Sequence, residues 1–241
     1  MKPLIVLPVV HEETTDACIS SIAPKYRNNL LVVDNSVSGF AHKYELEQTY
    51  TQKQNIGVSR SWNLGVKTLL RENHDFLIIL SASLVFTDGM ESLMEALRRN
   101  YDQNGMMTQE GWHCIAIHRR VFDLIGNFDT NFYPGYFEDS DFIRRMELAK
   151  IHEPTGKITF PGHEIQAKPA EVAHSMKRAK IQVNMQACAD YFIKKWGDYP
   201  RYTSQEDRDA LYKHPFNNPE FDLKYYEEHT IEELKLAYNL A

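Results

Sequence analysis

Three short apolar segments constrain the fold of this chain more than any other feature. PLIVLPVV spans residues 3–10, NLLVVDN spans residues 29–35 and DFLIILS spans residues 75–81. Continuous apolar strands of this kind are typical of a sheet that is covered on both faces. Helical spacing of apolar residues separates them, over residues 15–22 and 59–70. Strands that alternate with helices of this size predict crossover connections and a largely parallel sheet, and therefore an α/β fold.

The pattern continues beyond the third strand. Residues 87–100 predict a helix, with Asp88 as its N-cap and two arginines in its last turn. WHCIAIHRRVFDLIG predicts a strand followed by a short helix, and NFDTNFYPGYFED predicts an aromatic loop. A helix over SDFIRRMELAK is expected to place Phe142 and Met146 on its apolar face and its paired arginines off that face.

The last part of the chain reads differently. A long helical stretch is expected at about residues 177–196, and the segment from residue 198 onward is rich in Pro, Asn, Tyr and acidic residues. This tail predicts loops and short helices wrapped on a core, not a second domain with a core of its own. A chain of 241 residues suits one α/β domain with an appendage.

Composition narrows the function classes. The net charge of −6 argues against a general polyanion-binding surface, because nonspecific nucleic-acid affinity comes from phosphate neutralisation. Two basic stretches, at residues 174–180 and 191–197, are interpreted as solvated helix faces, with a local basic groove as the open alternative. The three cysteines lack metal-ligand spacing, as expected of free thiols in a reducing cytosol. No apolar run approaches the roughly 20 residues of a membrane span, so we expect a cytoplasmic protein.

Polar residues follow the predicted strands at the place where ligands bind. In an open parallel sheet, ligands occupy the crevice beyond the carboxyl ends of the strands. Three successive strands end in polar groups that suit a sugar or a base: His11 and Glu12, then Asp34, Asn35 and Ser36, then Ser81 and Ser83. The sequence therefore predicts a nucleotide pocket at this edge of the sheet.

Several short motifs occur in an order and spacing that match a known family. They are LPVVHEETTDACISSI, LLVVDNSVSGF, QNIGVSRSWNLGVK, FLIILSASLVFTDG, IHRRVFDLIGNFDTNFYPGYFEDSDFIRR and EVAHSMKR. Through them the chain resembles the inverting family-two nucleotide-sugar glycosyltransferases, which have a GT-A fold. The resemblance runs from about residue 4 to residue 178.

The resemblance implies a Rossmann-like GT-A domain over residues 1–200, with a mixed, mostly parallel sheet flanked by helices. Residues 1–105 would form its nucleotide-sugar half and residues 106–200 its acceptor half, while residues 201–241 would form a C-terminal helical extension packed on it. The implied activity is transfer of a sugar to an acceptor hydroxyl with inversion at the anomeric carbon. A UDP-sugar is the favoured donor.

The resemblance assigns donor binding to the strand ends and to the loop before the helix expected at 59–70. Asp34 would read the base or the ribose, since an ionised Asp accepts hydrogen bonds from an imide N–H or a hydroxyl; an Asx turn that ends the strand is the alternative. Gly57 and Gly65 would permit close backbone approach, and helix-start amides with Arg60 would favour anionic phosphate oxygens. The implied donor-binding residues are Pro8, His11, Glu12, Asp34, Asn35, Asn55, Gly57, Arg60, Asn63, Ser81 and Ser83.

The acidic motif YFEDSDF resembles the segment that carries the family's catalytic base. The resemblance makes Asp139 the base that deprotonates the acceptor, with Glu138 beside it and Asp141 capping or orienting the following helix. Adjacent carboxylates raise each other's pKa, which helps a base to hold a proton near neutrality. Aromatic residues near the motif would stack on the acceptor, and burial in the core is the open alternative for them. The implied acceptor residues are Trp112, Tyr136 and Phe137.

One departure from the family pattern concerns the metal. Where the family ends this strand with a carboxylate that holds Mg²⁺ or Mn²⁺, the chain has Ser-Ala-Ser at 81–83. A neutral hydroxyl is a poor ligand for a hard cation, whereas His174 matches the histidine that completes the family's metal site. Ser83 and His174 therefore imply a weak divalent-metal site that depends on the bound donor. The candidates to neutralise the leaving diphosphate are Arg60, Lys177 and Arg178.

The segment from YFIKKWG through HPFNNPEFDLKYY departs from the general family and resembles tails of glycosyltransferases encoded by bacteriophages. Some of those enzymes modify hydroxymethylated bases in DNA, so the acceptor is either a carbohydrate or hydroxymethylated DNA. In the DNA case the protein would act in the cytoplasm of a bacterial host. A reading of another class is an inactive nucleotide-sugar-binding protein, which the missing carboxylate at position 83 allows and the intact FEDSD motif opposes.

Overall fold

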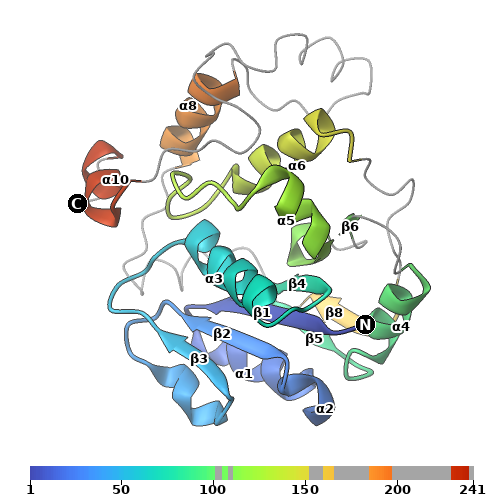
Figure 1. Cartoon of the computed structure of the whole chain (residues 1–241). Coiled ribbons are helices and arrows are strands. Elements are labelled where there is room, and N and C mark those ends of the chain that lie inside the picture. Colours follow the sequence, from blue (N-terminus) through green and yellow to red (C-terminus); the bar gives the residue numbers. More distant parts are fainter. Residues whose placement is uncertain (101–104, 108–110, 152–159, 166–184, 197–228, 239–241) are drawn as a thin grey trace.

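The computed structural model describes residues 1–100, 105–107, 111–151, 160–165, 185–196 and 229–238 (Figure 1). Its main sheet contains β1 (Pro3–Val9), β2 (Leu30–Asp34), β3 (Gln48–Thr51), β4 (Phe76–Leu80), β6 (Gly105–Met107) and β7 (Cys114–His118). The strand order is β3-β2-β1-β4-β7-β6. β1 pairs in parallel with β2 and β4, and β2 with β3, whereas β7 is antiparallel to both of its neighbours. The mixed, mostly parallel sheet predicted from the sequence is confirmed.

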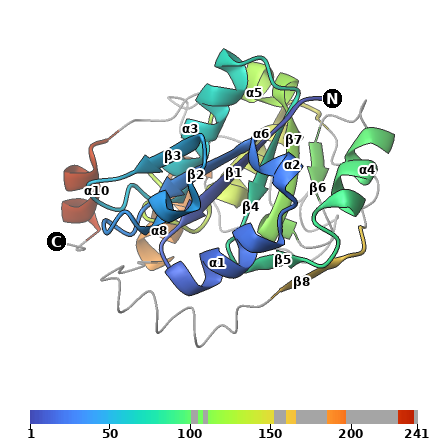
Figure 2. The same cartoon turned by 90° about the horizontal axis from the view of Figure 1, so that it is seen from below.

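Helices cover both faces of this sheet, as continuous apolar strands require. They are α1 (Glu12–Ser21), α2 (Pro24–Arg27), α3 (Val58–Arg71), α4 (Glu91–Arg99), α5 (Arg119–Ile125) and α6 (Glu138–Leu148), with 3-10 turns η1 (Phe40–Tyr44) and η2 (Gly111–His113). Side chains of β1 alternate between the two faces. Ile5 and Leu7 pack with residues of α1 and α4, whereas Leu4 and Val6 pack with residues of α3, α5 and α6. Figure 2 shows α3 and α5 on one side of the strands and α1 on the other. Apolar residues on both sides of the strand explain why its sequence does not alternate.

α3 approaches the sheet most closely at Gly65. A Cβ atom at this position would lie 2.9 Å from Cβ of Val6 and 3.0 Å from Cδ1 of Leu77. Both are core side chains, on β1 and β4, and a close-packed core leaves them little room to move. Gly65 therefore sets α3 directly against the strands, which fixes the position of the loop before α3 relative to the strand ends.

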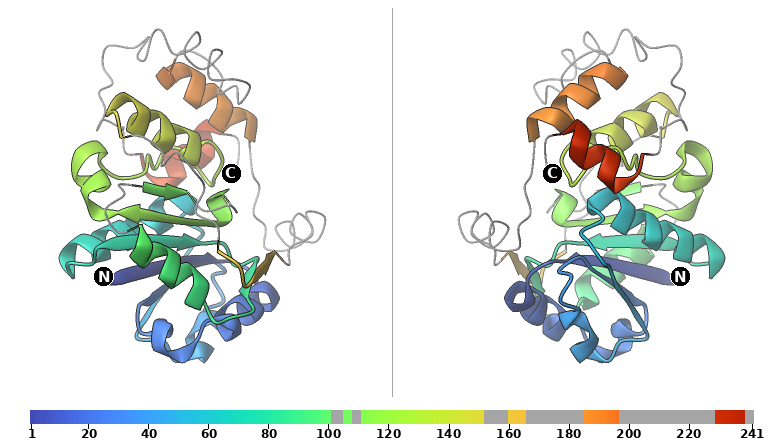
Figure 3. Two further views of the ribbon diagram at one scale, coloured as in Figure 1. Left: turned by 90° about the vertical axis from the view of Figure 1, so that its right-hand side faces the viewer. Right: turned by 90° about the vertical axis from the view of Figure 1, so that its left-hand side faces the viewer.

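Two further helices and a small second sheet complete the described chain. They are α8 (Met185–Trp196), α10 (Ile231–Ala237) and the antiparallel pair of β5 (Leu84–Phe86) with β8 (His163–Ile165). Cys188, Phe192 and Trp196 of α8 form an apolar cluster with Phe132 and Phe137 from the loop before α6. Figure 3 shows α8 beside α6, and α10 near the start of α3.

The interpretation of residues 191–197 as a solvated basic face is wrong at Lys195, and two arginines are buried as well. Arg144 and Arg145, expected off the apolar face of α6, are 5% and 1% exposed. Lys195, in a stretch interpreted as a solvated helix face, is fully buried on α8. Both Arg145 and Lys195 pair with Asp141, and a buried cation is tolerated where such a partner compensates it.

Three further sequence expectations concern the cysteines, the membrane and the basic segment near residue 174. The three cysteines are buried free thiols. In the part of the chain that the structure describes, no helix is long and apolar enough to cross a membrane. His174, Lys177 and Arg178 lie outside the described residues.

Candidate active site

The strand order creates a switch point between β1 and β4. The chain runs outward from β1 through β2 to β3, and then returns to the other side of β1 as β4. Such a reversal leaves space for a ligand beyond the carboxyl ends of the two adjacent strands. His11 follows β1 and Ser81 follows β4, so the structure brings these two predicted residues to the same edge of the sheet. Asp34 ends β2, the next strand along.

Asp34 is fully buried, and its carboxylate holds the loop that follows β2. Oδ1 accepts hydrogen bonds from the N–H of Ser36, at 2.9 Å, and from the Ser36 hydroxyl. Oδ2 accepts from the N–H of Ala41 at 3.0 Å. The Asx turn considered from the sequence is therefore present, and Oδ2 of Asp34 additionally holds the backbone at Ala41. The role of Asp34 toward a base or ribose stays a prediction.

The loop before α3 is shaped by two asparagines and a glycine. Asn35 donates to the Ser61 hydroxyl at 2.9 Å and accepts from a loop N–H at 3.1 Å. Asn55 accepts from the N–H of Gly57 at 2.9 Å. Gly57 has a φ of 81°, and a Cβ there would lie 3.0 Å from the carbonyl oxygen of Pro134. Only glycine suits that conformation and that contact, so the loop that the sequence assigned to the donor is held in one shape.

The two remaining donor candidates on α3 contact distant parts of the chain. Arg60 donates through Nη2 to the carbonyl oxygen of His229, just before α10. Asn63 brackets the backbone of Phe128, because its Oδ1 accepts from the N–H and its Nδ2 donates to the carbonyl oxygen, both at 2.9 Å. α3 therefore anchors the loop after α5 and the segment before α10. Donor contacts of Arg60 and Asn63 stay predictions.

The candidates on and after β1 differ in their surroundings. Pro8 lies within β1, and Glu12 begins α1 in an ion pair with Lys43 at 2.6 Å. His11 is partly buried, and burial lowers the pKa of its imidazole despite the charge of Glu13. Among the described residues, Nε2 of His11 has no hydrogen-bond partner. His11 thus keeps an unused polar atom beside the switch point.

Ser81 and Ser83 form a cluster with His113, a residue that the sequence did not single out. The two hydroxyl oxygens lie 2.8 Å apart, and Oγ of Ser83 lies 3.2 Å from Nδ1 of His113. The N–H of Ser81 donates to the carbonyl oxygen of His113 at 2.9 Å. This contact exists because Leu80 pairs with Cys114 across the antiparallel strands β4 and β7. The sequence predicted a strand in WHCIAIH, which includes His113, but it did not predict that this strand pairs with β4.

These side chains do not fit a tightly held divalent cation. Mg²⁺ and Ca²⁺ are held in proteins mainly by carboxylate and other oxygen ligands. The cluster instead offers two hydroxyls, already hydrogen-bonded, and one imidazole. Within the described residues, no group of three or more His, Cys, Asp or Glu side chains could hold a metal ion.

Glu138 and Asp139 begin α6. Glu138 is buried, and in the described part of the chain its Oε2 has no hydrogen-bond partner. Burial, and then the charge of Asp139, raise the pKa of Glu138 to about 8, so this carboxyl carries a proton at neutral pH. Asp139 is more exposed; burial raises its pKa as well, while its Oδ1 accepts from the N–H of Ser140 at 2.7 Å. The pair thus combines a protonated carboxyl with a more accessible one suited to accept a proton.

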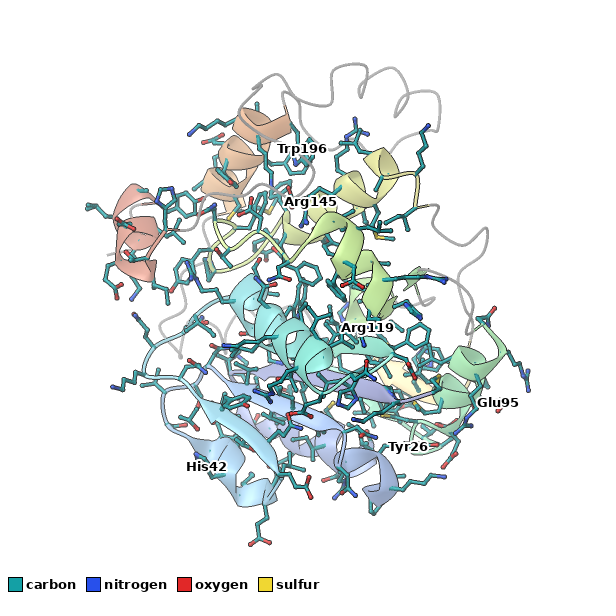
Figure 4. The ribbon with its side chains drawn as sticks, in the orientation of Figure 1. Tyr26, His42, Glu95, Arg119, Arg145 and Trp196 are labelled. Atoms are coloured by element: carbon teal, nitrogen blue, oxygen red, sulfur yellow. The ribbon has the colours of Figure 1, made fainter. Side chains whose placement is uncertain are left out.

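Asp141 lies inside α6, so it orients this helix and does not cap it. Its Oδ2 accepts from Nε of Arg145 at 2.9 Å, and its Oδ1 pairs with Nζ of Lys195 at 2.7 Å and accepts from Nε1 of Trp196 at 2.9 Å. Lys195 also pairs with Asp129 at 2.7 Å. Burial alone would raise the pKa of Asp141, but Lys195 and Arg145 hold it below its ordinary value. This network, in which Figure 4 labels Arg145 and Trp196, fastens α8 to the helix that begins with the carboxylate pair.

The three aromatic acceptor candidates lie in different environments. Trp112 stacks on Trp62 with ring centroids 5.5 Å apart, against the cluster under α3. Phe137 is buried in the cluster with α8, so the core alternative describes it. Tyr136 is 47% exposed and has a φ of 83°, a conformation that strains a residue other than glycine. Tyr136 is therefore the aromatic residue of the three that presents most of its ring to solvent.

Comparison with known proteins identifies the architecture. No family model and no curated protein matches this sequence. Solved structures do match, among them the mannosyltransferase PcManGT from Pyrobaculum calidifontis in complex with GDP-Man and Mn²⁺. Another is the glucosyl-3-phosphoglycerate synthase from Mycobacterium tuberculosis in complex with Mg²⁺ and uridine diphosphate. The fold is GT-A.

The extent of the similarity is comparable among these structures. The mannosyltransferase matches with a TM-score of 0.55 at 13% identity, over 83% of this chain and 66% of its own, just under two thirds. The synthase matches with a TM-score of 0.53 at 12% identity, over 78% of this chain and 77% of its own. Residues 1–349 of TarS from S. aureus match with a TM-score of 0.50 at 10% identity, over 88% and 69%. At these identities the likeness concerns the fold.

Proposed function

We propose that this chain is a glycosyltransferase that moves a sugar from a nucleoside-diphosphate sugar to an acceptor hydroxyl. The observation that carries the proposal is the carboxylate pair at the start of α6, in a chain with a GT-A fold. Burial keeps Glu138 protonated and raises the pKa of the more accessible Asp139. Carboxyl groups with perturbed pKa values cluster at catalytic sites, and a protein that only binds a sugar nucleotide needs no base.

In this proposal Asp139 accepts the proton of the acceptor hydroxyl while the hydroxyl oxygen attacks the anomeric carbon. A bond forms between that oxygen and the anomeric carbon, and the bond from this carbon to the diphosphate breaks with its electron pair leaving on the diphosphate. Attack and departure on opposite faces invert the configuration. Glu138, when protonated, places no second negative charge beside Asp139.

The donor is proposed to lie at the switch point between β1 and β4, with its base toward Asp34 at the end of β2. A UDP-sugar is the favoured donor, and the similar structures hold uridine diphosphate or GDP-Man. Those structures also hold Mg²⁺ or Mn²⁺. For this chain we propose a weakly bound divalent ion, held mainly through the donor's phosphates and water, since Mg²⁺ usually retains several waters. His174 and Ser83 are its proposed protein ligands.

The first proposed acceptor is a carbohydrate hydroxyl. Tyr136, which shortly precedes the carboxylate pair in the sequence, is exposed and could stack on the sugar ring. A hydroxymethylated base in DNA is the second, as in a phage-encoded enzyme that acts in the cytoplasm of a bacterial host. The buried position of Lys195 weakens the second acceptor, because a lysine enclosed between two aspartates does not reach a phosphate backbone. Its neighbour Lys194 is exposed.

A thermal-shift screen followed by an assay of nucleotide release tests the proposed function. UDP-, GDP-, dTDP- and CMP-sugars are each added to the full chain. Binding to the native state adds about 2.7 kcal/mol of stability at a ligand concentration about 100 times Kd. One class of donor should raise the melting midpoint and should release its nucleotide slowly without an acceptor. No shift with any donor would contradict the proposal, and a shift without nucleotide release would support the inactive binding protein.

A further inference from the structure

The cluster of Ser81, Ser83 and His113 combines hydrogen-bonding groups with no acid. Oγ of Ser81 accepts from the N–H of Ser83 at 3.3 Å and lies 2.8 Å from Oγ of Ser83, which in turn lies 3.2 Å from Nδ1 of His113. In the part of the chain that the structure describes, no Asp or Glu is bonded to any of the three. Hydroxyl and imidazole groups can all donate to an anion. An oxyanion is therefore a better ligand for this cluster than a hard cation.

Strand pairing sets the position of the cluster. Cys114 of β7 pairs with Leu80 of β4, which places His113 across from Ser81. The cluster consequently lies at the carboxyl end of β4, at the switch point beside β1. Ser83 is 7% exposed, whereas the side chain of His113 is exposed. The imidazole is thus the part of the cluster that reaches solvent.

The contact with Ser83 determines which ring atom can act on a ligand. When the Ser83 hydroxyl donates to Nδ1, the ring hydrogen lies on Nε2. Among the described residues, no hydrogen bond joins Nε2 of His113 to the protein. The Nε2–H group is then an oriented donor for an oxygen of the ligand. Ser83, which stands where the family has a carboxylate, therefore orients the imidazole beside it.

We propose that His113, oriented by Ser83, donates a hydrogen bond to the diphosphate of the nucleotide donor. The same bond stabilises the charge that the diphosphate gains as its bond to the anomeric carbon breaks. This inference rests on the proposed function and adds to it a residue that the sequence did not select. It means that side chains of this chain recognise the diphosphate without the help of a cation. An oriented donor at a developing oxyanion stabilises the transition state more than the ground state.

The test separates the affinity for the diphosphate from the affinity for the nucleoside. UDP, GDP, uridine and guanosine are titrated calorimetrically into the full chain in the presence of EDTA. A hydrogen bond to a charged group contributes about tenfold or more to affinity. His113→Ala should therefore weaken binding of UDP or GDP about tenfold and leave binding of the matching nucleoside unchanged. His113→Gln, whose amide can donate in place of Nε2, should retain part of the affinity.

His42, in the 3-10 turn η1 between β2 and β3, offers a matched control. Its imidazole is exposed, with Nε2 2.9 Å from the hydroxyl of Thr51 on the edge strand β3 (Figure 4). His42→Ala should keep the preference for diphosphate over nucleoside. If His113→Ala binds UDP and GDP as tightly as the wild type does, the inference is overturned and the proposed function stands. A preference for the diphosphate over the nucleoside that appears only when Mn²⁺ or Mg²⁺ is added would also overturn the inference and leave the proposed function standing. A wild-type chain that binds neither diphosphate under any of these conditions would overturn both.

Discussion

At the scale of single residues, the buried carboxyl of Glu138 has a consequence for stability. Burial, and then the charge of Asp139, raise its pKa from 4.5 to about 8. A group with a higher pKa in the folded state contributes stability at low pH, and the contribution is lost as the pH rises through the folded pKa. We predict that the free energy of unfolding of the wild type falls between about pH 5 and about pH 8, by about 1.4 kcal/mol for each unit of pKa shift. Glu138→Gln should remove most of this fall.

Urea unfolding at a series of pH values measures the effect. Glu47 is exposed, so Glu47→Gln should follow the wild type across the whole range. Parallel pH profiles for the wild type and Glu138→Gln would show that Glu138 is not held protonated in the folded chain.

Asp139 carries the chemistry in the proposed function. Asp139→Asn removes the base but keeps an oxygen to accept from the N–H of Ser140, so the start of α6 should remain folded. Turnover should fall about a hundredfold or more, in line with the usual contribution of a general base, and donor affinity should stay near that of the wild type. Steady-state kinetics and calorimetry measure the two quantities. If turnover survives in this variant and Glu138→Gln abolishes it, the base is Glu138.

The residue at position 83 is expected to set how tightly the site binds a divalent ion. Ser83→Asp would place a carboxylate within reach of the His113 imidazole, because the Ser83 hydroxyl already lies 3.2 Å from Nδ1 of His113. A carboxylate and an imidazole together suit Mn²⁺, so the variant should bind Mn²⁺ more tightly than the wild type in the presence of UDP. Calorimetric titration of Mn²⁺ measures the difference. Adding His113→Ala to the variant should reverse part of the gain, and an unchanged Mn²⁺ affinity in Ser83→Asp would place the ion elsewhere.

At the scale of elements, α6 and α8 are joined through Lys195. Its ammonium pairs with Asp129 and Asp141, both fully buried. Lys195→Met leaves Asp129 without its cationic partner and leaves Asp141 paired with Arg145 alone, and breaking a buried ion pair typically costs about 3–5 kcal/mol. Lys194→Met, an identical change at an exposed neighbour, should cost far less. Urea unfolding compares the two variants, and similar losses of stability would mean that the buried pairs do not hold α8 in place.

The sequence predicts elements whose signal is local. β1, β2 and β4 are continuous apolar runs, and α3 has a clear apolar face, so each was visible before the structure. β5, β6 and β8 have three residues each and β3 has four, too few to establish a period. Burial of Lys195 was not foreseen either, because its partner Asp129 lies 66 residues away in sequence.

The candidate site follows the same division. Polar residues at the strand ends could be predicted as a set, since the carboxyl ends of parallel strands meet at one edge. Their partners could not. Asn63 meets Phe128 across 65 residues, and Ser83 meets His113 across 30 residues, through a pairing of β4 with β7 that no local pattern encodes.

At the scale of the whole molecule, α10 connects the two sides of the proposed site. Before α10, the carbonyl oxygen of His229 accepts from Arg60 of α3. Within α10, Glu232 and Lys235 both bond to Gln54, in the loop before α3, at 2.7 and 2.8 Å. Tyr238, just after α10, donates to the carbonyl oxygen of a residue in the aromatic loop before α6 at 2.6 Å. A segment from the end of the chain thus contacts the loop assigned to the donor and the loop that leads to the carboxylate pair.

Two leucines of α10 allow this connection to be tested with one kind of substitution. Leu234 is 3% exposed, and Leu236 is 75% exposed. Replacing a buried leucine by alanine typically costs about 2–5 kcal/mol. At the edge of the fold, the cheapest response to Leu234→Ala is detachment of α10, which would release the contacts of Gln54 and Arg60. Leu234→Ala should therefore lower the melting midpoint, increase amide exchange in residues 52–57 and weaken UDP or GDP binding, whereas Leu236→Ala should leave all three unchanged. Equal effects of the two substitutions, or normal nucleotide affinity once α10 exchanges freely, would show that the donor loop keeps its shape without α10.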